Sequence, residues 1–274
     1  MPEPAPVLVA VAHGSADPRA SATIAELMTV AAERAGAGRP EAPELRAAFL
    51  GHAPPSLPQV LSTITGDRQV RVLPLLLTAA YHSKADIPRM LARAAEGFPG
   101  LRISYGATLG PHPLLLRALE RRLAEADGSD PGTRADRAPT GVVLAAAGSS
   151  DPEANAAIAR LAAQWQAGGG WWAVRPGYAS TADPSPAAAV TGLLRDGASR
   201  VVVASYLLAP GLFADRIRRT CLAAGAAAVS PALGAAPEVA DVLLERYASL
   251  PSLSVPAPSG PRRWWRSCGR TTPG

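Results

Sequence analysis

The chain repeats itself once. The segment VLVAVAHGSADP, which begins at Val7, returns as VVLAAAGSSDP from Val142. The segment RVLPLLLTAAYHSKAD, which begins at Arg71, returns as RVVVASYLLAPGLFAD from Arg200. With only two copies, the repeat indicates a duplicated domain and not a solenoid. Whatever the shared fold requires should be kept in both copies.

The four histidines break this repeat, because the second copy lacks all of them. The aligned pairs are His13 with Ala147, His82 with Gly211, His112 with Ala236 and, less securely, His52 with Thr181. A residue that only one copy keeps is not needed to build the fold. The histidines are therefore the first candidates for chemistry.

Each copy alternates short, continuous apolar runs with longer stretches of helical periodicity. Continuous apolar strands joined by helices are typical of parallel sheets that are covered on both faces. We therefore predict an α/β fold with two similar lobes, each a parallel sheet flanked by helices. Residues 1–125 would form the lobe with the histidines and 126–140 a linker. Residues 141–250 would form the lobe without histidines, and 251–274 a disordered tail.

Composition excludes several classes of protein. No apolar run reaches the roughly 18–20 residues that span a bilayer, and the first residues do not resemble a signal peptide. Cys221 and Cys268 have no metal or redox spacing, so we expect a cytoplasmic protein without a membrane partner. The arginines are scattered without an aromatic-rich basic stripe, which argues against nucleic acid. Arginine forks would suit a small polycarboxylate, and the duplication favours a monomer.

Two histidines follow strands that should end at one edge of a sheet. His13 ends the first apolar run and His82 follows the third, with Asp86 as the expected cap of the next helix. Ligands of open α/β sheets bind at the carboxyl edge of the strands. Two imidazoles that face one cleft indicate a metal site or acid–base chemistry. His52 and His112 follow the second and fourth strands, and each would be either a helper or a loop residue.

Other chemistries lack their motifs. The sequence has no GxGxxG after a strand, no P-loop and no GxSxG nucleophile elbow. The segment AHGS has Ala12 where a histidine phosphatase would have arginine. A metal-handling enzyme and a non-catalytic binding protein remain as interpretations.

Three motifs in order, HGSADP, FLGHAPPSLPQVL and PLLLTAAYHSKADIP, resemble the CbiX/SirB family of sirohydrochlorin chelatases. The resemblance covers residues 6–125 and, more weakly, 141–250, as in the long, duplicated members. It implies insertion of Co²⁺ or Fe²⁺ into sirohydrochlorin, in cobalamin or siroheme biosynthesis. These are class II chelatases, which need no ATP and no tightly bound cofactor, because the metal is a substrate. Cobalt and iron both suit histidine ligands, so the choice between them stays open.

The resemblance also implies roles for particular residues. His13 and His82 correspond to the metal-site histidines and would be catalytic. Ser15, Lys84 and Arg89 are expected to contact the tetrapyrrole, and Arg19 would lie at the cleft rim. The family often has a carboxylate where this chain has Gly51, so a third ligand is in doubt unless His52 compensates. The alternative is a non-catalytic tetrapyrrole-binding or metal-carrier protein.

Overall fold

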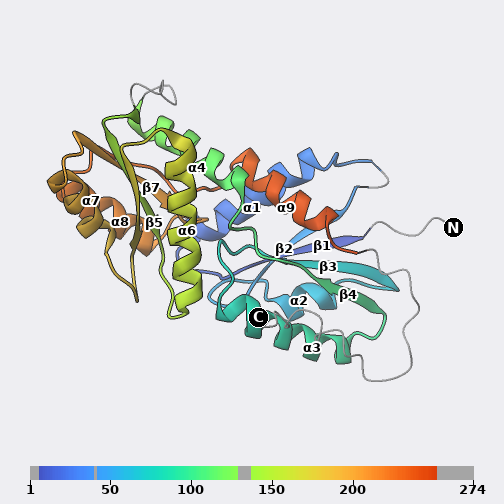
Figure 1. Ribbon diagram of the computed structural model, residues 1–274. Coiled ribbons are helices and arrows are strands. Elements are labelled where there is room, and N and C mark those ends of the chain that lie inside the picture. The colour runs from blue at the N-terminus through green and yellow to red at the C-terminus, as the bar shows by residue number, and fades with distance from the viewer. Residues whose placement is uncertain (1–5, 40–41, 129–136, 252–274) are drawn as a thin grey trace, which may run out of the picture.

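The computed structural model, which describes residues 6–39, 42–128 and 137–251, contains two four-stranded parallel sheets (Figure 1). The first sheet has the order β2-β1-β3-β4 and the second the order β6-β5-β7-β8. The strands of the first sheet are β1 (Val7–Ala12), β2 (Glu44–Phe49), β3 (Arg68–Pro74) and β4 (Leu101–Tyr105). Those of the second sheet are β5 (Thr140–Ala146), β6 (Ala173–Tyr178), β7 (Arg200–Tyr206) and β8 (Ala228–Val229). The predicted α/β fold with two lobes is confirmed.

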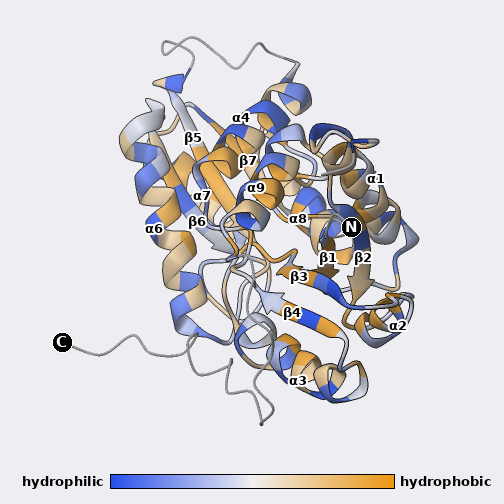
Figure 2. Ribbon diagram, turned by 90° about the vertical axis from the view of Figure 1, so that its right-hand side faces the viewer, coloured by the Kyte–Doolittle hydropathy of each residue, from blue (hydrophilic) through white to orange (hydrophobic). Residues whose placement is uncertain are grey.

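The helices follow the strands in the same order in both copies. In the first copy they are α1 (Pro18–Arg34), α2 (Leu57–Ser62), the π-helical turn η1 (His82–Asp86), α3 (Ile87–Gly97) and α4 (Pro113–Asp127). In the second they are α6 (Pro152–Gly169), α7 (Pro186–Arg195), α8 (Leu212–Ala223) and α9 (Pro237–Ala248). Figure 2 shows hydrophilic and hydrophobic bands alternating along α6, as expected of a helix with one face on a core.

The helix starts follow from local sequence. Asp17 and Asp151 hold extended backbones, and their carboxylates accept hydrogen bonds from the N–H groups of Arg19 and Glu153. A proline follows each aspartate and fits the first helical position, where no N–H is needed. The Asp-Pro pairs in the two copies are therefore explained by the fold.

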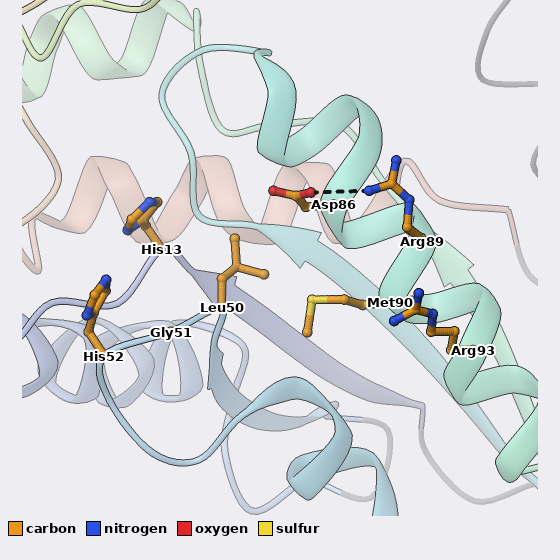
Figure 3. A pocket seen from close by; sticks show the side chains of 8 residues that line it. All are labelled: His13, Leu50, Gly51, His52, Asp86, Arg89, Met90 and Arg93. Atoms are coloured by element: carbon orange, nitrogen blue, oxygen red, sulfur yellow. Dashed lines mark ion pairs between the residues drawn. The ribbon is translucent and has the colours of Figure 1, made fainter.

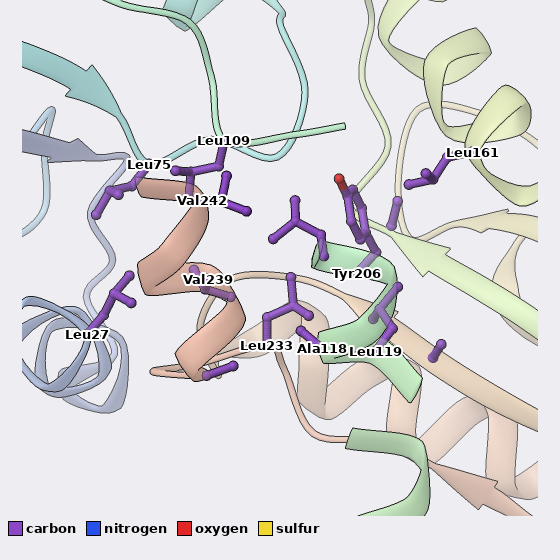
Figure 4. Packing of buried hydrophobic residues seen from close by; sticks show 14 of the residues in the cluster. Leu27, Leu75, Leu109, Ala118, Leu119, Leu161, Tyr206, Leu233, Val239 and Val242 are labelled. Carbon is purple, nitrogen blue, oxygen red and sulfur yellow. The ribbon is translucent and has the colours of Figure 1, made fainter. Parts of the chain in front are cut away.

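The two lobes share one central core. Alternate residues of β1 divide between the faces of the first sheet: Val7, Val9 and Val11 pack with α2 and α3. Leu8, Ala10 and Ala12 face the central core, which also takes in β5, β7 and the helices α1, α4, α6 and α9. Figure 4 shows this core, with Leu27 and Leu75 of the first copy near Val239 and Val242 of the second.

The last helix of each copy packs on the sheet of the other copy. Helix α4 packs on β7 and β8, and α9 packs on β3 and α1. The two exchanged helices also pack on each other. Ion pairs also connect the exchanged helix α9 to the first copy: Arg121 of α4 binds Glu238 of α9 at 3.0 Å, and Arg34 of α1 binds Asp241 of α9. Neither sheet is therefore fully covered by helices of its own copy.

Two predicted segments fall partly outside the described residues. The proposed linker, 126–140, includes 129–136, and the proposed tail, 251–274, is described only at residue 251. The division of the chain at these boundaries remains a prediction. Over the described ranges, no helix is both long enough and apolar enough to cross a membrane.

Candidate functional site

The loops after β1 and β2 are held together by their backbones. The N–H of Leu50 donates to the carbonyl of Ala12 at 3.0 Å, and that of Gly51 donates to the carbonyl of His13 at 3.2 Å. Gly14 has a φ of 87°, and a Cβ there would lie 1.8 Å from the Gly51 oxygen. Only glycine fits this close, left-handed position. The contact fixes His13 beside the Gly51–His52 turn.

The second copy repeats these loops without the histidines. Gly148 has a φ of 83°, and a Cβ there would lie 2.0 Å from the oxygen of Ser180. His52 and Thr181 both adopt a positive φ, 62° and 58° respectively. This shared backbone supports their alignment, which the sequence left insecure. Both copies therefore share the backbone conformation of these loops, and only the first copy carries imidazole side chains on them.

His13 and His52 face each other closely. Their ring centroids lie 6.5 Å apart with an interplanar angle of 17°, and both residues are exposed. Nδ1 of His13 lies 3.1 Å from the carbonyl oxygen of Gly14. Because a carbonyl only accepts hydrogen bonds, Nδ1 must be the donor, which in a neutral ring leaves the lone pair on Nε2. His13 is thus prepared to bind a metal or accept a proton through Nε2.

A cavity of about 450 Å³ lies between these histidines and helix α3 (Figure 3). Its lining residues come from the loops after β1 and β2, from the end of η1 and from α3: His13, Leu50, Gly51, His52, Asp86, Arg89, Met90 and Arg93. The last four follow the spacing i, i+3, i+4 and i+7, which places them on one face of a helix. The cavity therefore brings two imidazoles, two guanidinium groups and one carboxylate together.

His82 begins η1, on the loop that connects β3 to α3. Its side chain lies outside the described part of the structure, so only its backbone is located. That backbone leads directly into Asp86 and Arg89, which line the cavity with His13. Among the described residues, no group of three or more His, Cys, Asp or Glu side chains could hold a metal ion.

Asp86 does not cap α3, contrary to the interpretation of its sequence position. Its backbone is helical, with φ −68° and ψ −53°, and its side chain accepts no hydrogen bond from the start of the helix. A capping aspartate needs an extended backbone, as at Asp17. Because the π-helical turn η1 runs directly into α3, the backbone of Asp86 is already helical and α3 has no free start to cap. The Asp86 carboxylate instead faces the cavity, 3.8 Å from Arg89.

Two predicted rim cations reach across to the second lobe. Nζ of Lys84 lies 2.8 Å from the Asp151 carboxylate, and Arg19 bridges Asp17 and Asp215 at 2.6 Å each. The hydrogen bond from Lys84 holds the pKa of Asp151 below its ordinary value, and that from Arg19 lowers the pKa of Asp17. These contacts join the lobes at the edge where His13 lies.

Arg89, by contrast, lines the cavity itself. Its guanidinium is exposed, and hydrogen bonding to Tyr81 raises its pKa above the ordinary arginine value. It therefore remains a cation in the cavity at any physiological pH. Of the side chains predicted to contact the tetrapyrrole, Arg89 is the one that the cavity places with His13.

Ser15 and His112 have partners in the fold. The hydroxyl of Ser15 accepts a hydrogen bond from the Asp17 N–H at 3.1 Å, and Ser149 repeats this contact with Asp151. The repetition indicates a loop-forming role for Ser15. His112 caps α4 by accepting from the Leu114 N–H at 3.3 Å, and its Nε2 lies 3.1 Å from Glu245. Both ring nitrogens are engaged, and His112 is not among the residues that line the cavity.

On the helical wall of the cavity, sequence reasoning missed three residues: Asp86, Met90 and Arg93. Helical spacing would have found Arg93, which lies four residues along the helix from Arg89, and Met90, which lies four residues along from Asp86. Asp86 was seen only as a cap. Arg93 is the most informative of the three, because it places a second guanidinium beside Arg89.

Comparison with known proteins gives a consistent family. The family model CbiX matches residues 7–126 and again 141–250. A sirohydrochlorin cobaltochelatase of Priestia megaterium is 30% identical over 171 residues, which is 62% of this chain and 55% of that protein. A sirohydrochlorin ferrochelatase of Bacillus subtilis (strain 168) is 30% identical over 154 residues, 56% of each chain. The chain thus spans little more than half the length of these relatives.

Solved structures show the same fold. SirB from Bacillus subtilis with Fe³⁺ superimposes with a TM-score of 0.74 at 24% identity, covering 89% of this chain and 94% of that one. SirB from Bacillus subtilis subspecies spizizenii, in complex with cobalt, gives a TM-score of 0.69 at 25% identity, covering 88% and 93%. The paired sheets of the present chain therefore have the architecture of these structures.

Proposed function

The chain belongs to the CbiX family, and we propose on this premise that it inserts Co²⁺ or Fe²⁺ into sirohydrochlorin. The observation that carries the proposal is the cavity beside His13, which combines imidazoles with the guanidinium groups of Arg89 and Arg93. Imidazole nitrogen suits both metals, and guanidinium groups suit the carboxylates of the tetrapyrrole. The second copy has the same loop frame but none of these imidazoles.

Metal insertion replaces two pyrrole N–H protons with one divalent cation. The metal forms bonds to the four ring nitrogens, and two protons leave to a base or to water. A site for this step must hold the incoming ion loosely enough to release it. We propose His13 and His82 as its ligands, with water in the remaining positions. Two neutral imidazoles bind more weakly than a closed cage of four ligands, so the ion can pass on to the ring nitrogens.

His52 is the proposed proton acceptor beside this pair. Its ring lies 6.5 Å from that of His13, on the same wall of the cavity. Gly51 provides no side chain at the position where the family resemblance implies a carboxylate. A neighbouring imidazole would take over proton removal without adding negative charge that tightens metal binding. Cobalt and iron both remain candidates under this scheme.

A spectroscopic metallation assay tests the proposal. Purified protein is mixed with sirohydrochlorin and either Co²⁺ or, without oxygen, Fe²⁺, and the change in the absorption spectrum is followed against the uncatalysed reaction. The wild type should accelerate insertion, while His13→Ala and His82→Ala should abolish the acceleration without unfolding the protein. His112→Ala is the matched control, because His112 belongs to the cap of α4, and it should stay active.

The same assay distinguishes an enzyme from a protein that only binds the tetrapyrrole or the metal. A wild type that binds sirohydrochlorin or metal tightly but leaves the insertion rate unchanged would refute the enzyme. The protein would then be a tetrapyrrole-binding or metal-carrier protein. Full activity in both His13→Ala and His82→Ala would refute the assigned ligands and leave the overall activity intact.

A further inference from the structure

Two large apolar side chains stand in solvent at the start of α8. Leu212 is 86% exposed and Phe213 is 44% exposed. Scattered surface hydrophobics are common, but two adjacent ones at a helix start indicate a binding surface when they lie near a ligand site. The question is therefore what these two residues face.

Contacts at the same turn bring the start of α8 to the histidine loop. A Cβ placed on Gly211 would lie 4.0 Å from the Asp17 carboxylate, and Asp215 binds Arg19 at 2.6 Å. Asp17 ends the loop that begins with His13. Leu212 and Phe213 lie between these two cross-lobe contacts in sequence. They are therefore at the junction of the lobes, on the side of the histidine loop.

The duplication indicates the same position independently. Phe213 aligns with Lys84, and Asp17 aligns with Asp151. Lys84 reaches across to Asp151 at 2.8 Å. Because the lobes repeat each other, Phe213 should stand opposite Asp17 as Lys84 stands opposite Asp151. The copy without histidines has thus exchanged Ser83 and Lys84 for Leu and Phe.

We propose that Leu212 and Phe213 form an apolar wall for one face of the tetrapyrrole ring. This inference rests on the proposed function. A tetrapyrrole has a flat, largely apolar ring surrounded by carboxylates, so its site needs an apolar surface as well as cations. Arg89 and Arg93 provide the cations in the first lobe. The second lobe, whose sequence contains no histidine, provides the wall.

Binding of metal-free sirohydrochlorin tests this inference in the full chain. The variant Leu212→Ala/Phe213→Ala should bind it about tenfold more weakly, which corresponds to about 1.4 kcal/mol. Its affinity for Co²⁺ alone should be unchanged, because neither of these apolar side chains can serve as a metal ligand. Leu222→Ala is the matched control: Leu222 is 41% exposed on the same helix but at its far end, and its loss should leave both affinities unchanged.

Several outcomes would overturn the inference. One is a double variant that keeps a native fold by circular dichroism and still binds sirohydrochlorin with wild-type affinity. That result would show that Leu212 and Phe213 do not contact the tetrapyrrole. A change of oligomeric state in the double variant, at constant affinity for the tetrapyrrole, would assign the two residues to a contact between copies. Failure of the wild type to bind sirohydrochlorin at all would refute the proposed function, and this inference with it.

Discussion

Replacing Gly14 by alanine should damage both the stability and the metal site of this protein. The substituted residue would have to hold a φ of 87°, which costs an ordinary L-residue about 1–2 kcal/mol. Its Cβ would also lie 1.8 Å from the Gly51 oxygen, so the two loops must separate. Separation weakens the hydrogen bond from Gly51 to His13 and the one from Ala53 to Gly51. Each such bond contributes about 1 kcal/mol.

These contributions predict a loss of about 3 kcal/mol in the free energy of unfolding for Gly14→Ala. For a chain of this size the melting temperature should fall by about 6–12 °C. The matched control is Gly148→Ala, whose Cβ would meet the Ser180 oxygen at 2.0 Å in the loop without histidines. Its loss of stability should be similar, because the same backbone contacts are present in both lobes.

The two variants should differ in metal binding. Calorimetric titration with Co²⁺, below both melting temperatures, should show at least tenfold weaker binding for Gly14→Ala and wild-type binding for Gly148→Ala. Urea denaturation provides the two stability changes. A Gly14→Ala protein that loses less than about 1 kcal/mol would show that the loops tolerate a side chain there. Equal metal affinity in the two variants would show that the histidine geometry does not depend on this contact.

Two further predictions concern the site and its surroundings. Gly51→Glu should bind Co²⁺ about tenfold more tightly and insert it more slowly, because a carboxylate there adds a third ligand. The side chain has room, since a Cβ at Gly51 meets no atom within 4 Å. The uncharged Gly51→Gln is the control for calorimetry, and equal binding by the two variants would contradict the reasoning. His112→Ala should lower the free energy of unfolding by about 1–2 kcal/mol in urea denaturation, because α4 loses its cap and the contact of His112 with Glu245 is lost. A drop in metal affinity without a loss of stability would instead show that His112 contributes to the metal site.

The sequence predicted the elements better than their packing. Continuous apolar runs such as Val7–Ala12 became buried parallel strands, since such runs are stable only when both sheet faces are covered. The amphipathic pattern of α4 showed that one face is buried. It did not show which sheet that face covers, because periodicity carries no information on the partner. The exchange of α4 and α9 between lobes was therefore missed.

The candidate site was predicted where local sequence controls it. His13 lies at the carboxyl end of its strand, as parallel topology requires. The closeness of His52 to His13 depends on hydrogen bonds between loops separated by the whole of α1, such as Leu50 to Ala12. Asp86 was misread because a π-helical turn leaves no clear signal in the sequence. Arg93 was overlooked although helical spacing places it beside Arg89.

The exchange of the last helices has a consequence for how the chain must fold during synthesis. The first sheet leaves the ribosome early, but α9 (Pro237–Ala248), which packs on β3 and α1, is made near the end. Until then the surface that will receive α9 remains uncovered, and α4 has no second sheet to rest on. The first lobe therefore completes its folding only after the second copy is made, and a ribosome stalled between the repeats would hold an aggregation-prone intermediate.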